Sequence, residues 1–211
     1  MTAPTQAELA QACKILALRD EVLACAIADV GLPVWRATAA SYESLARIVV
    51  YQLISTKAAE AIWGRIAETL GEINAQTLLN HDPDRLLRCG LSRPKLKHLQ
   101  AIAMAVQTGQ LDFSRLTVTP IAAAREQLLA VRGIGPWTAD TFLMNALGHM
   151  DAFPHGDVGL LEAHRLLTGA HERLTSRVFS EAAEHWRPYR GVAAHLLYSW
   201  LHMQRDPSRN I

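Results

Sequence analysis

The chain has 211 residues, half of them apolar and 19% charged, and its formal net charge at pH 7 is +1. This composition supports a buried core and excludes disordered and collagen-like proteins. The near-zero charge excludes a protein that binds nucleic acid through bulk positive charge alone. Three widely spaced cysteines offer no disulfide framework. Because no signal sequence and no apolar run of about 20 residues occurs, we expect a cytoplasmic protein outside the membrane.

Apolar residues recur at helical spacing along the chain and rarely alternate with polar ones as in a strand. We therefore expect an all-α fold, with residues 1–211 forming one domain, a two-lobed helical bundle with a cleft between the lobes. The predicted helices cover residues 5–28, 42–54, 57–70, 83–89, 94–108, 120–131, 136–147, 158–168, 175–185 and 190–203. The strand-like run Ile48–Tyr51 lies within an apolar pattern of helical spacing, so we assign it to the helix at 42–54.

The most informative stretch is a predicted helical hairpin at 120–147. Thr119 suits the N-cap of its first helix, Pro120 suits the first helical position, and the second helix begins at Pro136 after Gly135. The two helices are therefore joined by a very tight turn.

The glycines of this turn give it a second property. Gly133 and Gly135 permit positive φ and a close approach of another molecule, while Ile134 can fill the gap between the helices. The N–H groups of the turn and of the second helix would then form a site for a phosphate. The simpler alternative is that Gly-x-Gly-Pro only connects two antiparallel helices.

Four segments in order carry a resemblance to a known family. They are residues 50–59 (VYQLISTKAA), residues 131–139 (VRGIGPWTA), the loop Phe153–Asp157 (FPHGD) and residues 186–190 (WRPYR). Together they resemble the helix-hairpin-helix base-excision DNA glycosylases, and more narrowly the 3-methyladenine DNA glycosylase II branch, which removes alkylated bases from double-stranded DNA. The resemblance runs from about residue 40 to residue 203.

The resemblance implies that Asp157, twenty residues after Trp137, is the catalytic carboxylate. Breaking an N-glycosidic bond develops positive charge on the sugar, which a fixed carboxylate stabilises. A structural alternative is that Asp157 caps the helix at 158–168, and the two roles are compatible because helix N–H groups favour a negative charge.

The resemblance also assigns the contacts with DNA. Trp137 and Tyr198 would stack on the extruded, electron-poor base, and core packing is the alternative for both. The residues implied in DNA binding are Gln52, Leu53, Arg132, Gly133, Ile134, Gly135 and Thr138. Leu53 would be the apolar wedge that fills the gap left by the base, although its spacing alone suits a core leucine. The run 85–111 holds five basic and no acidic residues and could help anchor DNA, or form a solvated helix face.

The resemblance and the spacing of the metal-binding residue types also lead to expectations about cofactors and partners. We expect no cofactor and no metal cluster, apart from a monovalent cation at the carbonyls of Val131 and Ile134; His149, Asp151, His155 and Asp157 match no zinc-ligand spacing. Bifunctional relatives carry a lysine where Trp137 stands, so no strand-cleaving lyase activity is expected. We further expect a monomer without the N-terminal sheet domain of the two-part bacterial form. The alternative from another functional class is a non-catalytic DNA-binding module.

Overall fold

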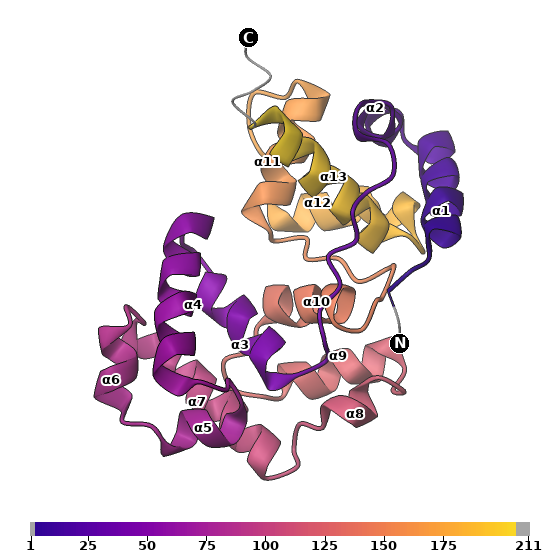
Figure 1. Cartoon of the computed structure of the whole chain (residues 1–211). Helices are drawn as coiled ribbons and strands as arrows, with labels where there is room; N and C mark the ends of the chain where they lie inside the picture. The colour runs from indigo at the N-terminus through magenta and orange to yellow at the C-terminus, as the bar shows by residue number, and fades with distance from the viewer. Residues whose placement is uncertain (1–2, 206–211) are drawn as a thin grey trace. The chain divides into compact units, whose positions relative to one another are not determined.

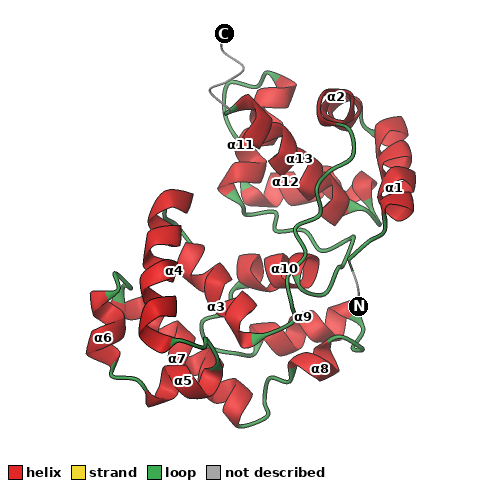
Figure 2. Cartoon of the chain, viewed as in Figure 1, coloured by secondary structure: helices red, strands yellow, loops and turns green. Residues whose placement is uncertain are grey.

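The computed structural model describes residues 3–205, and all regular secondary structure within this range is helical (Figure 2). The predicted all-α fold is therefore confirmed. The chain divides into two compact units (Figure 1): residues 38–147 form unit 1, and the segments 3–37 and 148–205 together form unit 2. Between residues 3 and 205, no helix is long and apolar enough to cross a membrane.

Unit 1 is one continuous segment of the chain. Its helices are α3 (Tyr42–Tyr51), α4 (Thr56–Leu70), α5 (Ala75–Asn80), α6 (Pro83–Arg88), α7 (Arg93–Gln107), α8 (Phe113–Leu116), α9 (Ile121–Leu129) and α10 (Pro136–Asn145). Helix α7 packs against α3, α5 and α6, while α10 packs against α3 and α9. Helices α3, α7 and α10 thus form the centre of unit 1, and the α3–α4 and α9–α10 turns adjoin these helices.

Unit 2 combines the two ends of the described chain. Its elements are α1 (Gln6–Arg19), α2 (Glu21–Val30), α11 (Val158–Thr168), α12 (Ser176–Ala182), the 3-10 helix η1 (Ala183–Trp186) and α13 (Arg190–Gln204). Helix α13 packs against α2 and α11, and residues 191–197 of this helix are all buried. Such a helix, apolar around most of its circumference, belongs to the centre of a core.

The predicted single helix at 5–28 is wrong, because the chain breaks at Asp20. This residue has φ of −149°, and its Oδ1 accepts hydrogen bonds from the backbone N–H groups of Val22 (2.8 Å) and Leu23 (3.1 Å), which begin α2. Its Oδ2 accepts a further bond from the indole of Trp186 at 2.7 Å and lies 2.8 Å from Nε2 of His185. The break is therefore stabilised by partners more than 160 residues away, which no local pattern shows.

Other boundaries differ by smaller amounts. Helix α3 ends at Tyr51 rather than at 54, and the short helices α5 and α8 were not predicted. Pro120, not Thr119, is the N-cap of α9; the Thr119 hydroxyl instead donates to the carbonyl of Arg115 at 2.8 Å. The expectation that Ile48–Tyr51 is helical is confirmed.

Candidate DNA-binding and catalytic site

The turn between α9 and α10 in unit 1 is tight and has an open helix end. The N–H of Ile134 donates to the carbonyl of Val131 at 3.1 Å, and the Ile134 side chain is buried as predicted. Gly135 is the N-cap of α10, and no side chain caps this helix. A helix N-terminus without a side-chain cap is a common binding place for anions.

The two glycines of the turn have different roles. Gly133 has φ of +95°, and a Cβ added to it would lie 2.6 Å from Cβ of His98 on α7. Gly135 has φ of −89°, and no atom lies within 4 Å of the position of its missing Cβ. Only Gly133 therefore uses the positive φ that glycine permits, and Gly135 is the one that leaves space for an approaching molecule.

Leu53 lies in the turn between α3 and α4 and is 98% exposed. It has φ of +58°, the one positive value of a non-glycine residue in the described chain. The alternative of a core leucine is thus excluded. An apolar side chain that is fully exposed on a backbone costing about 1–2 kcal/mol is unfavourable for an isolated protein and is typical of a functional site.

The polar residues predicted near this turn and the hairpin contact each other. Nε2 of Gln52 donates to Oγ1 of Thr138 at 2.6 Å, and Thr138 is buried. Arg132 is exposed at the hairpin turn, and Trp137 is half-buried in the first turn of α10. One turn further along α10, the Thr141 hydroxyl is buried without a hydrogen-bond partner among residues 3–205.

A partly buried ion pair, which the sequence analysis missed, fixes the two hairpin helices to each other. Arg125 of α9 donates to both carboxylate oxygens of Asp140 of α10, at 2.6 and 3.1 Å, and the Asp140 side chain is 7% exposed. A bidentate pair of this kind fixes orientation as well as distance. The spacing of fifteen residues between the partners carries no helical signal, because they lie on different helices.

In unit 2, Asp157 is the N-cap of α11, as the structural alternative required. Its Oδ1 accepts hydrogen bonds from the N–H groups of Gly159 (2.7 Å) and Leu160 (3.1 Å). The phenol of Tyr198 on α13 lies near this carboxylate. Burial, followed by the negative charge of Asp157, raises the pKa of Tyr198 well above its usual value. Tyr198 therefore remains a neutral phenol beside the carboxylate.

The loop that leads to Asp157 is held by α13 and by Arg187, which precedes it. The carboxylate of Asp151 accepts from the guanidinium of Arg190 (2.9 and 3.0 Å) and of Arg187 (2.7 Å). Gly191 lies so close to the loop that a Cβ would be 2.9 Å from the carbonyl oxygens of His149 and Met150. Sequence analysis missed these contacts, although both arginines stand in the segment 186–190.

The remaining candidates of unit 2 have structural contacts. Trp200 donates its indole N–H to Asp29 at 2.8 Å and is buried. No group of three or more His, Cys, Asp or Glu residues that could hold a metal ion occurs within residues 3–205. Of the four residues weighed for zinc, Asp151 pairs with arginines and Asp157 caps α11.

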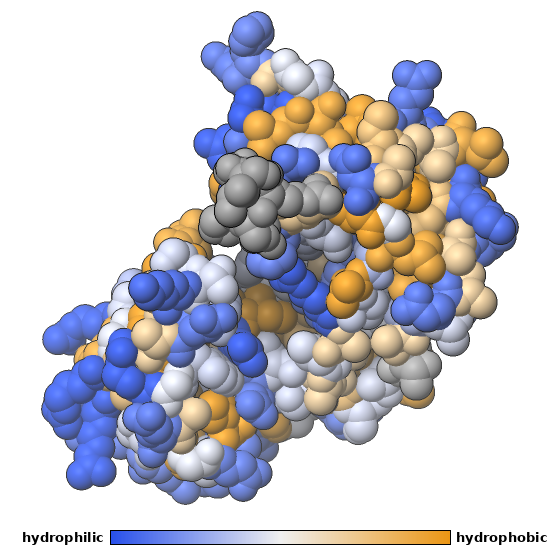
Figure 3. Space-filling view, turned by 45° about the horizontal axis from the view of Figure 1, so that its top comes forward, coloured by the Kyte–Doolittle hydropathy of each residue, from blue (hydrophilic) through white to orange (hydrophobic). Residues whose placement is uncertain are grey.

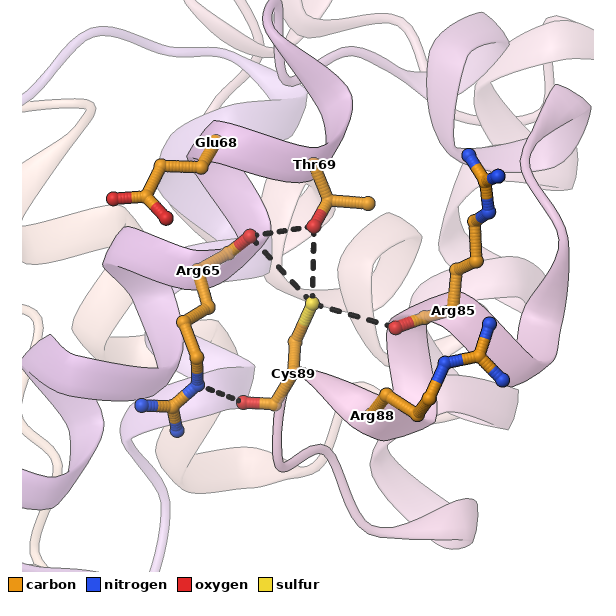
Figure 4. Close-up of a pocket in the computed structure, with 6 residues that line it drawn as sticks. All are labelled: Arg65, Glu68, Thr69, Arg85, Arg88 and Cys89. Carbon is orange, nitrogen blue, oxygen red and sulfur yellow. Dashed lines mark hydrogen bonds between the residues drawn. The ribbon is translucent and has the colours of Figure 1, made fainter.

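A separate pocket in unit 1 contains none of the predicted site residues. Its volume is about 550 Å³, and it is lined by Arg65, Glu68, Thr69, Arg85, Arg88 and Cys89. Figure 4 shows the guanidinium of Arg65 bonded to the Cys89 carbonyl (2.8 Å), and the Cys89 sulfur 3.3 Å from the Thr69 hydroxyl. The first two arginines of the basic run at 85–111 thus line a shallow surface pocket between α4 and α6.

On the face drawn in Figure 3, hydrophilic and hydrophobic residues are interspersed.

Comparison with known proteins gives related chains. The probable bifunctional transcriptional activator/DNA repair enzyme AlkA of Mycobacterium tuberculosis is 30% identical over 172 residues, which are 75% of this chain and 33% of that protein. This chain therefore spans one third of the length of that relative. DNA-3-methyladenine glycosylase 1 of Schizosaccharomyces pombe is 28% identical over 74% of this chain and 71% of its own length.

Solved structures and a family comparison agree with these relatives. The structure of a DNA-3-methyladenine glycosidase from Bacillus halodurans has a TM-score of 0.75 and 30% identity, covering 90% of this chain and 89% of the other. The S. pombe 3-methyladenine DNA glycosylase Mag1, in complex with abasic DNA, has a TM-score of 0.83 and 26% identity, covering 89% and 95%. Residues 46–188 match the HhH-GPD superfamily. The chain belongs to this superfamily of base excision DNA repair proteins.

Proposed function

We propose that this protein is a monofunctional DNA glycosylase that hydrolyses the N-glycosidic bond of alkylated bases, of the 3-methyladenine type, in double-stranded DNA. Membership of the superfamily and the names of the relatives support this proposal. The observation that carries it is the Asp157 carboxylate, whose Oδ1 is held in one orientation by two backbone N–H groups at the start of α11.

In this mechanism the carboxylate of Asp157 acts on the sugar of the damaged nucleotide. As the base departs with the electrons of the glycosidic bond, positive charge develops on the sugar, and the carboxylate stabilises it. Water then adds to C1′ and loses a proton. An alkylated purine already carries positive charge and leaves readily, so no partnered general acid is required. The bonds to Oδ1 fix the orientation of the carboxylate before the reaction begins, which lowers the reorganisation cost.

Unit 1 contributes the contacts with DNA in this proposal. The N–H groups at the start of α10, beside the open Gly135, bind a backbone phosphate, and Arg132 adds a charge. Leu53 occupies the gap that an extruded base leaves in the duplex. An aromatic face stacks on a cationic base more strongly than on a neutral one, and Trp137 and Tyr198 are each candidates for this role.

Lyase activity is absent from the proposal because Trp137 stands where the bifunctional relatives carry an amine nucleophile. The Val131 carbonyl accepts one hydrogen bond, from Ile134, and keeps a second lone pair, so it can hold a monovalent cation together with the Ile134 carbonyl. Such a cation would add positive charge beside a bound phosphate. We expect the protein to act as a monomer in the cytoplasm.

Base release tests the proposal directly. The protein is incubated with duplexes that each contain one lesion: 3-methyladenine, 7-methylguanine, hypoxanthine, ethenoadenine or an alkylated pyrimidine. Released bases are separated by chromatography, and strand breaks are measured with and without alkali. We expect release of alkylated bases and breaks only after alkali. A protein that binds these duplexes and releases no base is a DNA-binding module instead, and breaks without alkali contradict the monofunctional assignment.

A further inference from the structure

The side chain of Lys95 enters the turn that carries Leu53. Lys95 lies in the first turn of α7, and its Nζ donates hydrogen bonds to the carbonyls of Val50 and Gln52, each at 2.7 Å. Both carbonyls belong to the end of α3, and Gln52 directly precedes Leu53. One ammonium group therefore bonds two carbonyls of the segment that directly precedes the exposed leucine.

The last carbonyls of a helix have no partners within the helix and carry a partial negative charge. An ammonium group is well suited to them, because it supplies several donors and a full positive charge. Placing it there has a cost, since burial lowers the pKa of Lys95. Lys95 has no ion pair with a carboxylate in the described chain. Its observed partners are thus the two carbonyls alone.

The geometry next to these carbonyls is strained. The α3 helix closes with a long bond from Gln52 N–H to Val49 O (3.4 Å), and Leu53 follows with φ of +58°. The Gln52 side chain is in turn bonded to Thr138 of α10. The backbone carbonyl of Gln52 is therefore bonded to α7, and its side-chain amide is bonded to α10. The side chain of Leu53, by contrast, is almost fully exposed.

We propose that Lys95 is a positioning residue for Leu53: by bonding the carbonyls of Val50 and Gln52, it holds the α3–α4 turn in the conformation that presents Leu53 to a gap in duplex DNA. The inference rests on the wedge role proposed for Leu53. Lys95 acts on DNA through the turn and does not touch the phosphates. Without the ammonium, the turn relaxes to a lower-energy backbone and Leu53 loses its fixed direction.

The competing role for a lysine in a DNA-binding protein is a phosphate contact, and the two roles leave different signatures. A phosphate contact strengthens binding to damaged and undamaged duplexes alike, and its loss lowers the slope of log Kd against log salt by about 1. A positioning residue for the wedge strengthens binding only where there is a gap to fill, and its loss leaves the salt slope unchanged. Lys97 provides a matched control, because it is exposed and on the same helix.

The test measures binding of the full chain to two duplexes of one sequence, one of which contains a tetrahydrofuran abasic analogue. The preference is the ratio of the two Kd values, determined at several KCl concentrations for wild type, Lys95→Met, Lys97→Met, Leu53→Ala and the double variant Lys95→Met/Leu53→Ala. We expect Lys95→Met to lower the preference about tenfold with an unchanged salt slope, and Lys97→Met to keep the wild-type preference. The double variant should match Leu53→Ala, since positions that act through one another are not additive.

Three results would overturn the inference. The first is a Lys95→Met protein that keeps the wild-type preference for the abasic duplex. The second is a loss of preference in Lys97→Met as large as that in Lys95→Met. The third is a double variant whose preference is a further tenfold below that of Leu53→Ala. If Lys95→Met does not fold, Lys95→Gln is measured in its place, since its amide can donate to one carbonyl and should give a smaller loss of preference. Base release is scored separately. If the wild type releases no base, and Lys95→Met still lowers the preference for the abasic duplex, only the glycosylase function is refuted. If the wild type shows no such preference, the wedge role of Leu53 and the positioning role of Lys95 are both refuted.

Discussion

Replacing Asp157 with Asn separates the charge of this side chain from its role as a helix cap. The Asn oxygen can still accept the bonds from Gly159 and Leu160, now 2.7 and 3.1 Å long, and Asn is as good an N-cap as Asp. The variant should therefore fold with a melting temperature within about 2 °C of wild type. What it lacks is the negative charge that the proposed mechanism places beside the reacting sugar.

The expected loss of activity follows from that charge. Removing one preorganised electrostatic partner of a transition state costs about 3–4 kcal/mol, so base release should slow by at least ~10²-fold. The assay is single-turnover release of base from alkylated duplex DNA with the enzyme in excess. Binding to an abasic duplex, measured in parallel, should change much less, because the hairpin amides and Leu53 are untouched.

Asp157→Ala supplies the matched comparison. It removes the charge and the cap together, so its activity should fall as far as that of Asp157→Asn, while its stability falls by about a further 1 kcal/mol, equivalent to a decrease of ~2–4 °C in melting temperature for a chain of this size. A fully active Asp157→Asn protein would refute the catalytic assignment. An Ala variant as stable as the Asn variant would show that the bonds to α11 contribute nothing to folding.

Four further substitutions test other parts of the molecule. Leu53→Ala should alter the melting temperature by less than about 2 °C, because the side chain is exposed, and should slow base release from duplex more than from single-stranded DNA; equal slowing would contradict the wedge. Gly133→Ala should destabilise the fold through its positive φ and its close contact with α7, whereas Gly135→Val, at an open position, should keep the melting temperature and weaken binding to all duplexes alike; wild-type affinity would remove the hairpin from the interface. Burial and a nearby arginine lower the pKa of His195 from 6.5 to about 3. The contribution of His195 to the free energy of unfolding is therefore complete above pH 6.5 and decreases as the pH falls toward 3. At pH 5 the decrease is about 2 kcal/mol. His195→Leu should therefore lose less melting temperature between pH 7 and pH 5 than wild type or the exposed control His202→Leu, and parallel curves for all three would refute this account.

Local sequence signals located the long helices and most of their ends. Glycine and proline marked the turns, and periodicity correctly placed Ile48–Tyr51 in a helix. The short helices α5 and α8 were missed because six and four residues are too few to show a period. The break at Asp20 was missed because helix-forming residues continue on both sides, and the indole that stabilises it comes from the far end of the chain.

The candidate site was predictable where a single segment contains both the residue and its setting. The position of Asp157 directly before an apolar helical pattern indicates a capping aspartate, and the structure has this cap. Spacing alone could not predict the exposure of Leu53, since it continues the apolar face of α3; only the family resemblance pointed to it. The turn that exposes it is hydrogen-bonded to Lys95 and Thr138, which lie more than 40 residues away. Contacts of this kind are set by the packing of helices.

The way in which the chain is divided between the units has a consequence for its synthesis. Unit 2 contains α1 and α2 from the beginning of the chain, but their partner α13 ends at Gln204. At about 5–20 residues per second, a ribosome needs roughly 5–20 s to make the intervening residues of unit 1. Unit 1 is continuous and can therefore fold first during translation. Helices α1 and α2 cannot pack against α13 until α13 has been synthesised. A nascent chain halted after Leu147 should hold a folded unit 1 and an N-terminal segment that proteases can still cut.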